Sequence, residues 1–592
     1  MNTPIEQTTI ATTTTMTDTD TTTNTTTDTT IMSVLQFNPI DNTLVVPIFA
    51  NDSTKSEGDQ PQYQFGVLEI STTEKEALPY TWDVKFDVDC SGSMSDKCAD
   101  GREKMHHIKH VLSNILRLFA TYSHMRFNVS VEAFDDKLNP IFDFVQITSK
   151  NIESYIAKIH TIYPIGQTNL MLPLRQTRKQ MADRAAEFPA HKRLHFLLTD
   201  GVDTCGNSSA KIVNTVEPQY DTIVFGFGID HDSQTLMAIG EKPCCEYAFI
   251  AELEKAGIVY GEYIHNVLYR SVEEMRVLLE NAEIYCWKTN TWNTSLTIGN
   301  IASGLKKTYY VRTTNPINTV QGEIHGCECT MDGVRTLAKL DDIAQLPYLV
   351  NSAGEIVAES LISFNEHALR LKTLELLHEV AHLDDENPTD AGDLSQSIFA
   401  SSNWALPPRK PVKYYNNVKV AKEKLSELYR KIRDYKVATF GEETENTFLA
   451  ALMDDLYVAR RGLDHHNGRL YTMSRQRTQG TQNVYTPTNI DDMLTPSVSH
   501  NLCSSTPRAN YDDDDYMGLL DDIVIPEYTS APYTPMAPRT RHPTATDTVI
   551  DSDEKDILSH NISCGTQDIN ATPRMLQIIR STSDGSSEND LA

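Results

Sequence analysis

Residues 82–95 have the sequence WDVKFDVDCSGSMS, a strand-like run that leads directly into a polar turn. From Val84 to Val88 apolar residues alternate with charged ones, and this period of two predicts a buried β-strand. The strand ends at Asp89, and Ser91 and Ser93 follow on a turn that contains glycine. One carboxylate and two hydroxyls at this spacing can point at a single centre. Oxygen ligands without sulfur or imidazole favour Mg²⁺.

Two later stretches carry oxygen-bearing side chains at the ends of predicted elements. The sequence Gly166-Gln167-Thr168-Asn169 precedes an expected helix over 172–188, and the apolar run 194–198 ends on Thr199-Asp200-Gly201. In a doubly wound sheet, ligands bind in the crevice beyond the carboxyl ends of the strands. We therefore expect Thr168 and Asp200 to lie beside the turn after the first strand.

Together these stretches resemble the metal-ion-dependent adhesion site of the von Willebrand factor A domain family. The family pattern is Asp-x-Ser-x-Ser, then a Thr, then an Asp, and it is matched by Asp89, Ser91, Ser93, Thr168 and Asp200. The resemblance implies that both serines bind Mg²⁺ (or Mn²⁺), that the threonine joins directly or through water, and that the aspartates hold coordinated waters. One coordination position would stay open for an Asp or Glu of a protein partner. We thus expect a metal-dependent adhesion or scaffold module more than an enzyme.

Residues 80–282 alternate between strand-like and helical patterns. This order predicts an α/β domain with a doubly wound, mostly parallel sheet. The turn Phe227-Gly228-Ile229-Asp230 and the strand-like run 246–250 (EYAFI) add to the family resemblance. The stretch Tyr263–Leu279 is expected to close the domain as a helix.

The segments on both sides of this domain contain strand-like runs, which in residues 33–75 are too few to form a core alone. They lie at 33–37, 44–49 and 64–70, and again at 283–287, 294–298, 307–312 and 355–361. We expect residues 33–75 and 283–362 to form one β-sandwich into which the α/β domain is inserted. The alternative is two separate small β units, each with a thin core.

The remaining segments are expected to be helical or disordered. Residues 363–470 have helical patterns at 365–383, 418–436 and 444–463 and predict a helical module. Residues 1–32 are rich in Thr and residues 475–592 are acidic, so disorder is predicted for both. The acidic tail could itself occupy the metal site. The stretch Tyr511–Ile525, YDDDDYMGLLDDIVI, could be a docking motif or a solvated run of charge.

A different chemistry is indicated by residues 378–382, HEVAH, which match the HExxH pattern of zinc metallopeptidases. His378 and His382 would share one helix face as zinc ligands, and Glu379 could act as general base. The third histidine of the extended pattern is absent, because Pro388 stands at that position. A downstream glutamate ligand could come from positions 442 and 443, which lie in no recognisable motif. The alternatives are therefore a zinc peptidase and a packing helix with two flanking histidines.

The bulk composition restricts the class of partner and compartment. The chain has 592 residues, a net charge of −29 and ten cysteines. The negative charge disfavours nonspecific nucleic-acid binding and attraction to anionic membranes. The sequence has no signal-peptide pattern, no run of 18 apolar residues and no CxxC pair. We expect an intracellular, cytoplasmic protein without a transmembrane helix, whose partners are proteins or cations.

Overall fold

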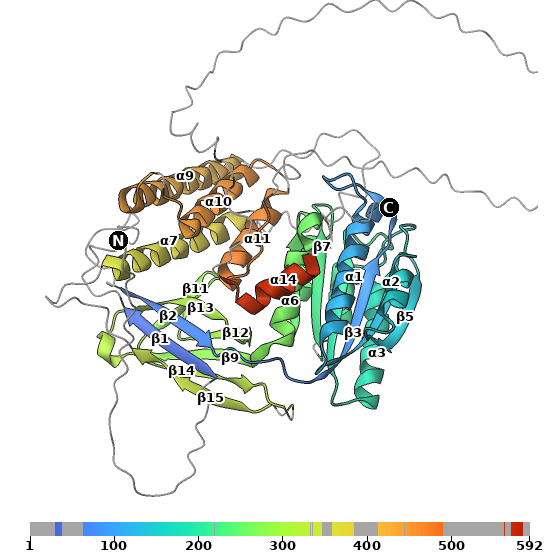
Figure 1. Cartoon of the computed structure of the whole chain (residues 1–592). Helices are drawn as coiled ribbons and strands as arrows, with labels where there is room; N and C mark the ends of the chain where they lie inside the picture. The colour runs from blue at the N-terminus through green and yellow to red at the C-terminus, as the bar shows by residue number, and fades with distance from the viewer. Residues whose placement is uncertain are drawn as a thin grey trace, which may run out of the picture.

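The computed structural model describes residues 30–37, 63–345 (except 218, 332 and 334), 358–383, 412–488 (except 443 and 466), 560, 562 and 570–583. Within these residues the chain forms an α/β unit, a β region of two sheets, and a group of helices that contacts both (Figure 1). None of the described helices combines the length and the apolar composition that crossing a membrane requires.

The α/β unit is built on a six-stranded sheet in the order β5-β4-β3-β6-β7-β8. All neighbouring strands are parallel except β4 and β5, which form an antiparallel hairpin. The strands are β3 (Thr81–Asp89), β4 (Arg126–Phe134), β5 (Leu138–Gln146), β6 (Lys192–Thr199), β7 (Asp221–Phe227) and β8 (Cys245–Ile250). The predicted α/β fold with a mostly parallel sheet is confirmed.

Helices cover both faces of this sheet, which makes it doubly wound. One face shares a core with α1 (Lys104–Thr121), α2 (Ile152–Ile159) and α6 (Ala256–Leu268). The other face shares a core with α3 (Met171–Glu187), α4 (Ser209–Thr215) and α5 (Ser233–Gly240). Because the parallel strands point the same way, the loops that follow β3 and β6 meet at one edge of the sheet.

The central strand β3 is buried on both faces, although its polar residues alternate with apolar ones. Lys85 Nζ lies 2.7 Å from Glu132 Oε2. Asp87 Oδ2 accepts a hydrogen bond from Thr177 Oγ1 at 2.6 Å and lies 3.0 Å from His195 Nε2. A buried charge is tolerated when a partner of opposite charge or a hydrogen-bond donor meets it. The polar face of β3 therefore packs inside the unit instead of facing water.

The β region combines strands from both sides of the α/β unit. One sheet has the order β11-β10-β13-β2-β1-β16 and the other has the order β12-β9-β14-β15. β2 (Gln64–Thr72) pairs with β13 (Lys306–Thr313), so the α/β unit lies in the chain between two neighbouring strands. Apolar side chains of both sheets form one buried cluster. The other strands are β1 (Ile31–Phe37), β9 (Arg270–Glu280), β10 (Glu283–Cys286), β11 (Thr291–Asn293), β12 (Ser295–Ala302), β14 (Gln321–Glu328), β15 (Leu337–Asp342) and β16 (Ala344–Gln345).

A group of helices packs beside both units. It contains α7 (Ala358–Ala381), α9 (Val412–Phe440), α10 (Thr447–Gly462) and α11 (Gly468–Thr481). Their apolar side chains continue the core of the sheet face that α5 covers. A last helix, α14 (Pro573–Ser583), lies beside α6 (Figure 1). The two helices are far apart in the sequence.

Two expected elements are wrong. Tyr263–Leu279 is not one helix, because α6 ends at Leu268 and β9 begins at Arg270. From Glu273 onward buried and exposed residues alternate, and β9 pairs with β12 and β14 on its two sides. The strand expected at 355–361 is also wrong for 358–361, which belong to α7. In both places a short apolar run fits either period, so the sequence pattern alone does not distinguish strand from helix.

The predicted disorder of both chain ends is wrong in part. Strand β1 begins at Ile31, inside the Thr-rich segment. In the acidic tail, residues 475–488 complete α11 and its following turn, and residues 570–583 include α14. α14 buries Met575, Ile578 and Ile579. These residues form a helical stripe that is not visible in the average composition of the acidic tail. The run 44–49 and the stretch 511–525 lie outside the described residues.

Candidate functional site

The turn after β3 brings a carboxylate and two hydroxyls together. Asp89 Oδ1 accepts a hydrogen bond from the Ser91 backbone N–H at 2.8 Å, and Ser91 Oγ lies 3.1 Å from Ser93 Oγ. Asp89 and Ser91 are buried, whereas Ser93 is partly exposed. The group is therefore anchored in the protein and open to solvent on the side of Ser93.

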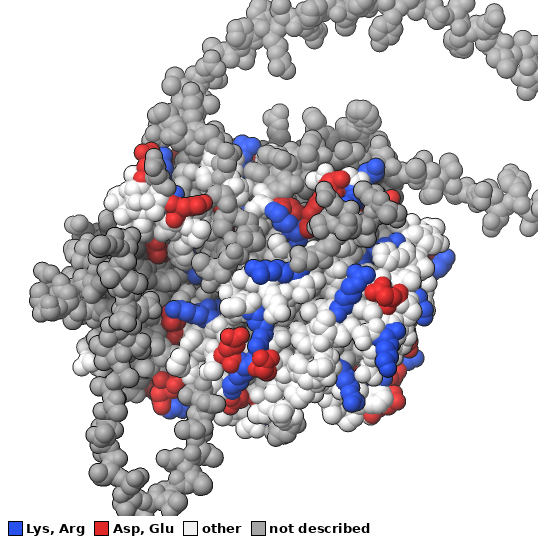
Figure 2. All heavy atoms as spheres, viewed as in Figure 1, with Lys and Arg blue, Asp and Glu red and all other residues white. Residues whose placement is uncertain are grey.

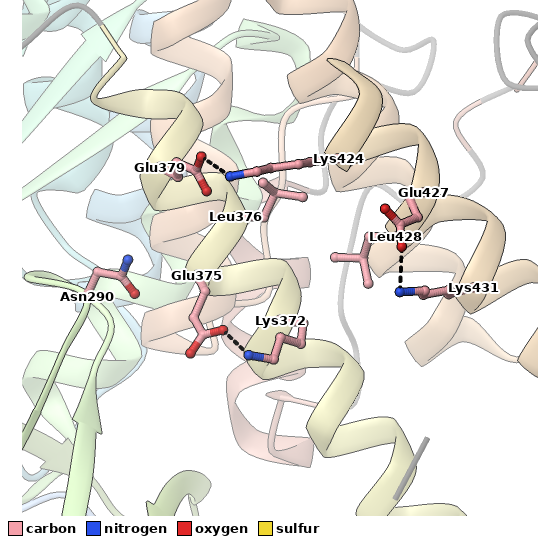
Figure 3. Close-up of a pocket in the computed structure, with 9 residues that line it drawn as sticks. All are labelled: Asn290, Lys372, Glu375, Leu376, Glu379, Lys424, Glu427, Leu428 and Lys431. Atoms are coloured by element: carbon pink, nitrogen blue, oxygen red, sulfur yellow. Dashed lines mark hydrogen bonds and ion pairs between the residues drawn. The ribbon is translucent and has the colours of Figure 1, made fainter. Parts of the chain in front are cut away.

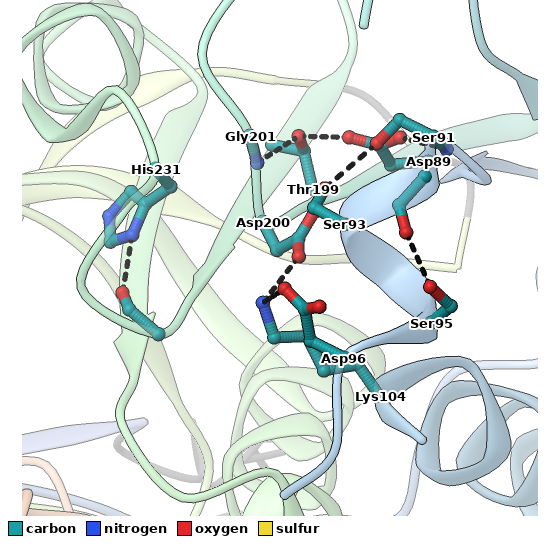
Figure 4. A network of polar contacts seen from close by, with 12 residues as sticks. Asp89, Ser91, Ser93, Ser95, Asp96, Lys104, Thr199, Asp200, Gly201 and His231 are labelled. Carbon is teal, nitrogen blue, oxygen red and sulfur yellow. Dashed lines mark hydrogen bonds and ion pairs between the residues drawn. The ribbon is translucent and has the colours of Figure 1, made fainter. Parts of the chain in front are cut away.

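The loop after β6 supplies the second carboxylate of this group. Asp200 Oδ1 accepts a hydrogen bond from Ser93 Oγ at 2.7 Å (Figure 4). Thr199 Oγ1 donates to Asp89 Oδ2 at 2.6 Å and accepts from the Gly201 N–H at 3.2 Å. Both aspartates are at most 1% exposed. Each of the two buried carboxylates thus accepts a hydrogen bond from a hydroxyl side chain at the edge of the sheet.

Thr168 reaches the same edge because Gly201 has no side chain. A Cβ added at Gly201 would lie 2.8 Å from Thr168 Oγ1. The hydrogen bonds that hold the loop carrying Thr168 include one from the Gly92 N–H to Gly166 O at 3.2 Å and one from the Thr168 N–H to Thr204 Oγ1 at 3.0 Å. The structure therefore brings the five residues predicted from the sequence to one rim of the sheet.

Lys104 belongs to this group of residues, and the sequence analysis missed it. It is the first residue of α1, and its Nζ lies 2.6 Å from Asp200 Oδ2 and 3.8 Å from Asp96 Oδ2 (Figure 4). Burial works against the charged amine, but the Asp200 carboxylate outweighs it and raises the pKa of Lys104. Several lysines lie near this position, and no sequence signal distinguishes the one that faces the carboxylate.

The two buried carboxylates repel each other. Burial and, second, the charge of Asp200 raise the pKa of Asp89 to about 7, although hydrogen bonds from Thr199 and Ser91 act in the opposite direction. A cation beside these oxygens would favour the ionised form of Asp89. The electrostatics of the group therefore favour binding of a cation.

The spacing of the oxygen atoms also fits a magnesium-sized ion. Mg²⁺ takes six oxygen ligands at 2.0–2.1 Å in a near-ideal octahedron, so adjacent ligands lie about 2.9 Å apart. Ser91 Oγ and Ser93 Oγ are 3.1 Å apart, and Ser93 Oγ and Asp200 Oδ1 are 2.7 Å apart. All the donors are hard oxygens, which suit Mg²⁺ or Mn²⁺.

His231 lies behind the rim and supports the loop after β7. Its Nδ1 lies 2.7 Å from Gly228 O (Figure 4). Its Nε2 lies 2.6 Å from the Tyr247 hydroxyl. Burial lowers the pKa of His231 to about 4, so the ring is neutral near pH 7. Since both nitrogens have partners, His231 holds the loop after β7 and is not a candidate ligand.

The HExxH stretch lies on α7, where Glu379 lines a charged hollow facing α9 (Figure 3). Glu379 Oε1 lies 2.5 Å from Lys424 Nζ. The rings of His378 and His382 stack with centroids 4.1 Å apart, and His382 Nδ1 lies 2.8 Å from His378 O. Across the described residues, no third His, Cys, Asp or Glu joins these histidines in a group that could hold a metal ion. Of the two expected downstream glutamates, position 443 lies outside the described residues.

Comparison with known proteins places the site in a family. Residues 83–259 match the family described as von Willebrand factor type A domain. No curated protein sequence matches the chain. Among solved structures, a von Willebrand factor type A protein from Catenulispora acidiphila is 12% identical, with 65% of this chain and 87% of that chain covered and a TM-score of 0.37.

Two further structures have similarly low identity. The ArnB paralog VWA2 from Sulfolobus acidocaldarius is 11% identical, with 76% of this chain and 98% of that chain covered and a TM-score of 0.36. The manganese-loaded TRAP protein of Plasmodium vivax is 19% identical, with 31% and 73% covered and a TM-score of 0.24. The family match and the doubly wound sheet agree, and residues 83–259 of this chain are a von Willebrand factor type A domain.

Proposed function

We propose that this chain is a metal-dependent protein-binding module that holds Mg²⁺ at Asp89, Ser91, Ser93, Thr168 and Asp200. The observation that carries the proposal is the convergence of two neighbouring serine hydroxyls and two buried carboxylates at the rim of the sheet. The serine hydroxyls bind the ion directly, the threonine joins directly or through water, and the aspartates orient coordinated waters. Mn²⁺ can take the place of Mg²⁺, because both ions prefer oxygen ligands.

A bound divalent ion supplies an electrophilic position that a carboxylate from another protein can occupy. The direct ligands are mostly neutral hydroxyls, so they leave much of the ion's charge uncompensated. Lys104 adds to this effect, because its amine already pairs with one oxygen of Asp200. An Asp or Glu side chain then completes the octahedron, and recognition requires no bond to break. The proposed activity is therefore binding and not catalysis.

The surface charge supports recognition at the ion itself. On the face seen in Figure 2, Lys and Arg side chains lie among Asp and Glu side chains, and no broad patch of one sign covers it. The chain as a whole has a net charge of −29, so it does not attract an acidic partner from a distance. We infer that the acidic side chain of the partner is selected by the metal and its immediate ligands.

The chain's own acidic tail is a second candidate occupant of the open position. The Thr488 N–H donates to Glu252 Oε1 at 3.0 Å, and Glu252 lies two residues after the end of β8, at the carboxyl edge of the sheet. At its other end the segment is fastened through Thr582, whose Oγ1 donates to Gly257 O at 2.7 Å. The acidic residues between these anchors therefore have a high effective concentration at the rim.

Isothermal titration of the full chain with MgCl₂ tests the metal site. The wild type is expected to bind one Mg²⁺, and Ser91→Ala/Ser93→Ala is expected to lose it. Ser95→Ala is the matched control, because Ser95 lies on the same turn but its Oγ donates to Gly92 O at 2.7 Å. Equal Mg²⁺ affinity in the wild type and the double variant would overturn the proposal.

The occupant is tested by adding an acidic peptide in Mg²⁺ or in EDTA. The peptide is expected to bind only in Mg²⁺ and only to chains that keep both serines. Replacing the acidic residues of 511–525 with Asn and Gln in the full chain is expected to tighten peptide binding. Unchanged affinity would exclude this stretch as the resting occupant, while the metal-binding proposal would stand on the titration alone.

A further inference from the structure

A second cluster of metal-binding side chains lies in the same domain, apart from the five residues described above. The candidate ligand atoms of Cys98, His107 and Glu254 all lie within 4.8 Å of one another. They come from three segments: the loop 96–103, the first turn of α1, and the short 3₁₀ turn η2 (Leu253–Lys255) that follows β8. In the part of the chain that the structure describes, this is the one such group of three.

Asp100 borders this cluster without belonging to it. Its Oδ2 lies 3.2 Å from His107 Nε2, and its backbone N–H donates to Glu254 Oε1 at 3.3 Å. Its carboxylate is not one of the ligand atoms that all lie within 4.8 Å of one another. One sulfur, one imidazole and one carboxylate therefore converge, and a second carboxylate contacts the imidazole.

The loop that carries Cys98 and Asp100 is folded back on itself. The Cys98 N–H donates to Arg102 O at 2.8 Å, and the Gly101 N–H donates to Cys98 O at 2.9 Å. Gly101 has φ +82°, a conformation that suits glycine. A bridge between Lys97 and Glu103 closes the base of the loop. The backbone thus brings Cys98 and its neighbours back to the start of α1, where His107 is buried.

The kinds of donor discriminate between metal ions. Sulfur and imidazole are ligands of zinc and other borderline or soft ions, whereas Mg²⁺ and Ca²⁺ prefer oxygen. The cluster is therefore chemically different from the all-oxygen group at the rim. Zinc takes four ligands in a tetrahedron, so three protein ligands leave one position for water.

We propose that Cys98, His107 and Glu254 bind zinc and that the ion fastens the loop 96–103 to α1 and η2. On binding, the Cys98 thiol releases its proton to solvent, the thiolate, the neutral imidazole and the Glu254 carboxylate coordinate the ion, and a water molecule takes the fourth position. The same loop carries Asp96, which contacts Lys104 beside the rim (Figure 4). Zinc would thus order a segment next to the proposed magnesium site. This inference does not depend on the proposed function.

Cobalt binding to the full chain tests the site, because Co²⁺ replaces Zn²⁺ and reports its ligands by absorption. With Mg²⁺ present in excess, one equivalent of Co²⁺ is expected to give a sulfur-to-cobalt charge-transfer band that one equivalent of Zn²⁺ removes. Cys98→Ser is expected to abolish this band. His107→Gln and Glu254→Gln are expected to lower zinc affinity by about 10–100-fold, the range seen for lost metal-site contacts.

Matched variants separate this cluster from other thiols, histidines and metal ligands. Cys244→Ser is the cysteine control, because Cys244 is exposed and precedes β8 at the opposite edge of the sheet. His106→Gln is the histidine control, since His106 is the exposed neighbour of His107 on α1. Ser91→Ala/Ser93→Ala should also keep the band. If Cys98→Ser keeps the charge-transfer band, or if the wild type shows no such band, the proposed zinc site is wrong.

The variant Glu254→Gln distinguishes loss of zinc binding from loss of the fold. Glu254 is exposed, so Glu254→Gln should leave the Tm of the metal-free chain unchanged. The rise in Tm that zinc produces in the wild type should then be smaller in this variant. An equal zinc-induced rise in both chains would overturn the assignment of Glu254 and of the site.

Discussion

The contact between α6 and α14 predicts that one substitution will have opposite effects in two forms of the chain. A Cβ added at Gly261 in α6 would lie 2.6 Å from Ile579 Cα and 2.7 Å from Thr582 Oγ1. One turn earlier, a Cβ at Gly257 would lie 2.8 Å from Ser583 Cα. Since the nearest atoms include the backbone of α14, a side-chain rotation cannot make room. The two glycines therefore permit α14 to dock.

The magnitude follows from what α14 buries. Met575, Ile578 and Ile579 are at most 8% exposed, and full burial of such a side chain contributes about 1.5–3 kcal/mol. In the full chain, Gly261→Ala should cost about 1–3 kcal/mol through overpacking. In a chain that ends at residue 569 the contact is absent. The same alanine should then stabilise α6 by about 0.5–1 kcal/mol, because alanine is a better helix former than glycine.

Calorimetry of four chains checks this reversal: the wild type and Gly261→Ala, each at full length or ending at residue 569. We expect a lower Tm for the full-length variant and a slightly higher Tm for the truncated one. Hydrogen exchange of the amides in 573–583 should become faster in the full-length variant, which shows that the helix has loosened. If alanine lowers the Tm equally in both backgrounds, the proposed contact is wrong, because independent sites add and coupled sites do not.

Three further predictions concern the sheet, the rim and the buried histidines. Lys85→Met leaves two buried carboxylates without their cation and should lower the free energy of unfolding by about 3–5 kcal/mol, measured by urea denaturation; an unchanged unfolding midpoint would contradict the buried pairing. Gly201→Ala should displace the Thr168 hydroxyl and weaken Mg²⁺ binding by about 10–100-fold in a titration, with little change in Tm. Burial lowers the pKa of His231 and of His265 to about 4. The stability that their neutral rings contribute is fully present above the unfolded pKa of 6.5 and is lost as the pH falls through about 4. The Tm should therefore decrease on acidification below pH 6.5. Replacing both histidines with Phe should make that decrease smaller.

Local patterns predicted most of the α/β domain because its elements are separated by clear turns. The period of two in β3 and the helical pattern of 172–188 are properties of adjacent residues, and the structure has both elements at the predicted places, as β3 and α3. Elements with ambiguous periods were missed. β9 follows α6 after one residue, and its identity as a strand depends on pairing with β12 and β14.

The chain ends show a different limit of sequence reasoning. An average over the acidic tail predicts disorder, yet α14 is a short helix with three buried apolar residues. Its stability comes from the surface of α6, more than 300 residues away in the sequence. A composition window cannot detect this, because the helix has no stable form without its distant partner.

The sequence by itself determined the order of strands and turns and the oxygen-bearing residues at the strand ends, because side-chain period and turn chemistry act between near neighbours. The five residues of the rim could therefore be named without coordinates. Only the tertiary structure decided that Lys104 covers an oxygen of Asp200 and that Glu254 approaches Cys98 and His107. These contacts join segments that lie far apart in the chain, and each residue alone resembles an ordinary surface or loop residue. Their chemistry exists only after the sheet has brought the segments together.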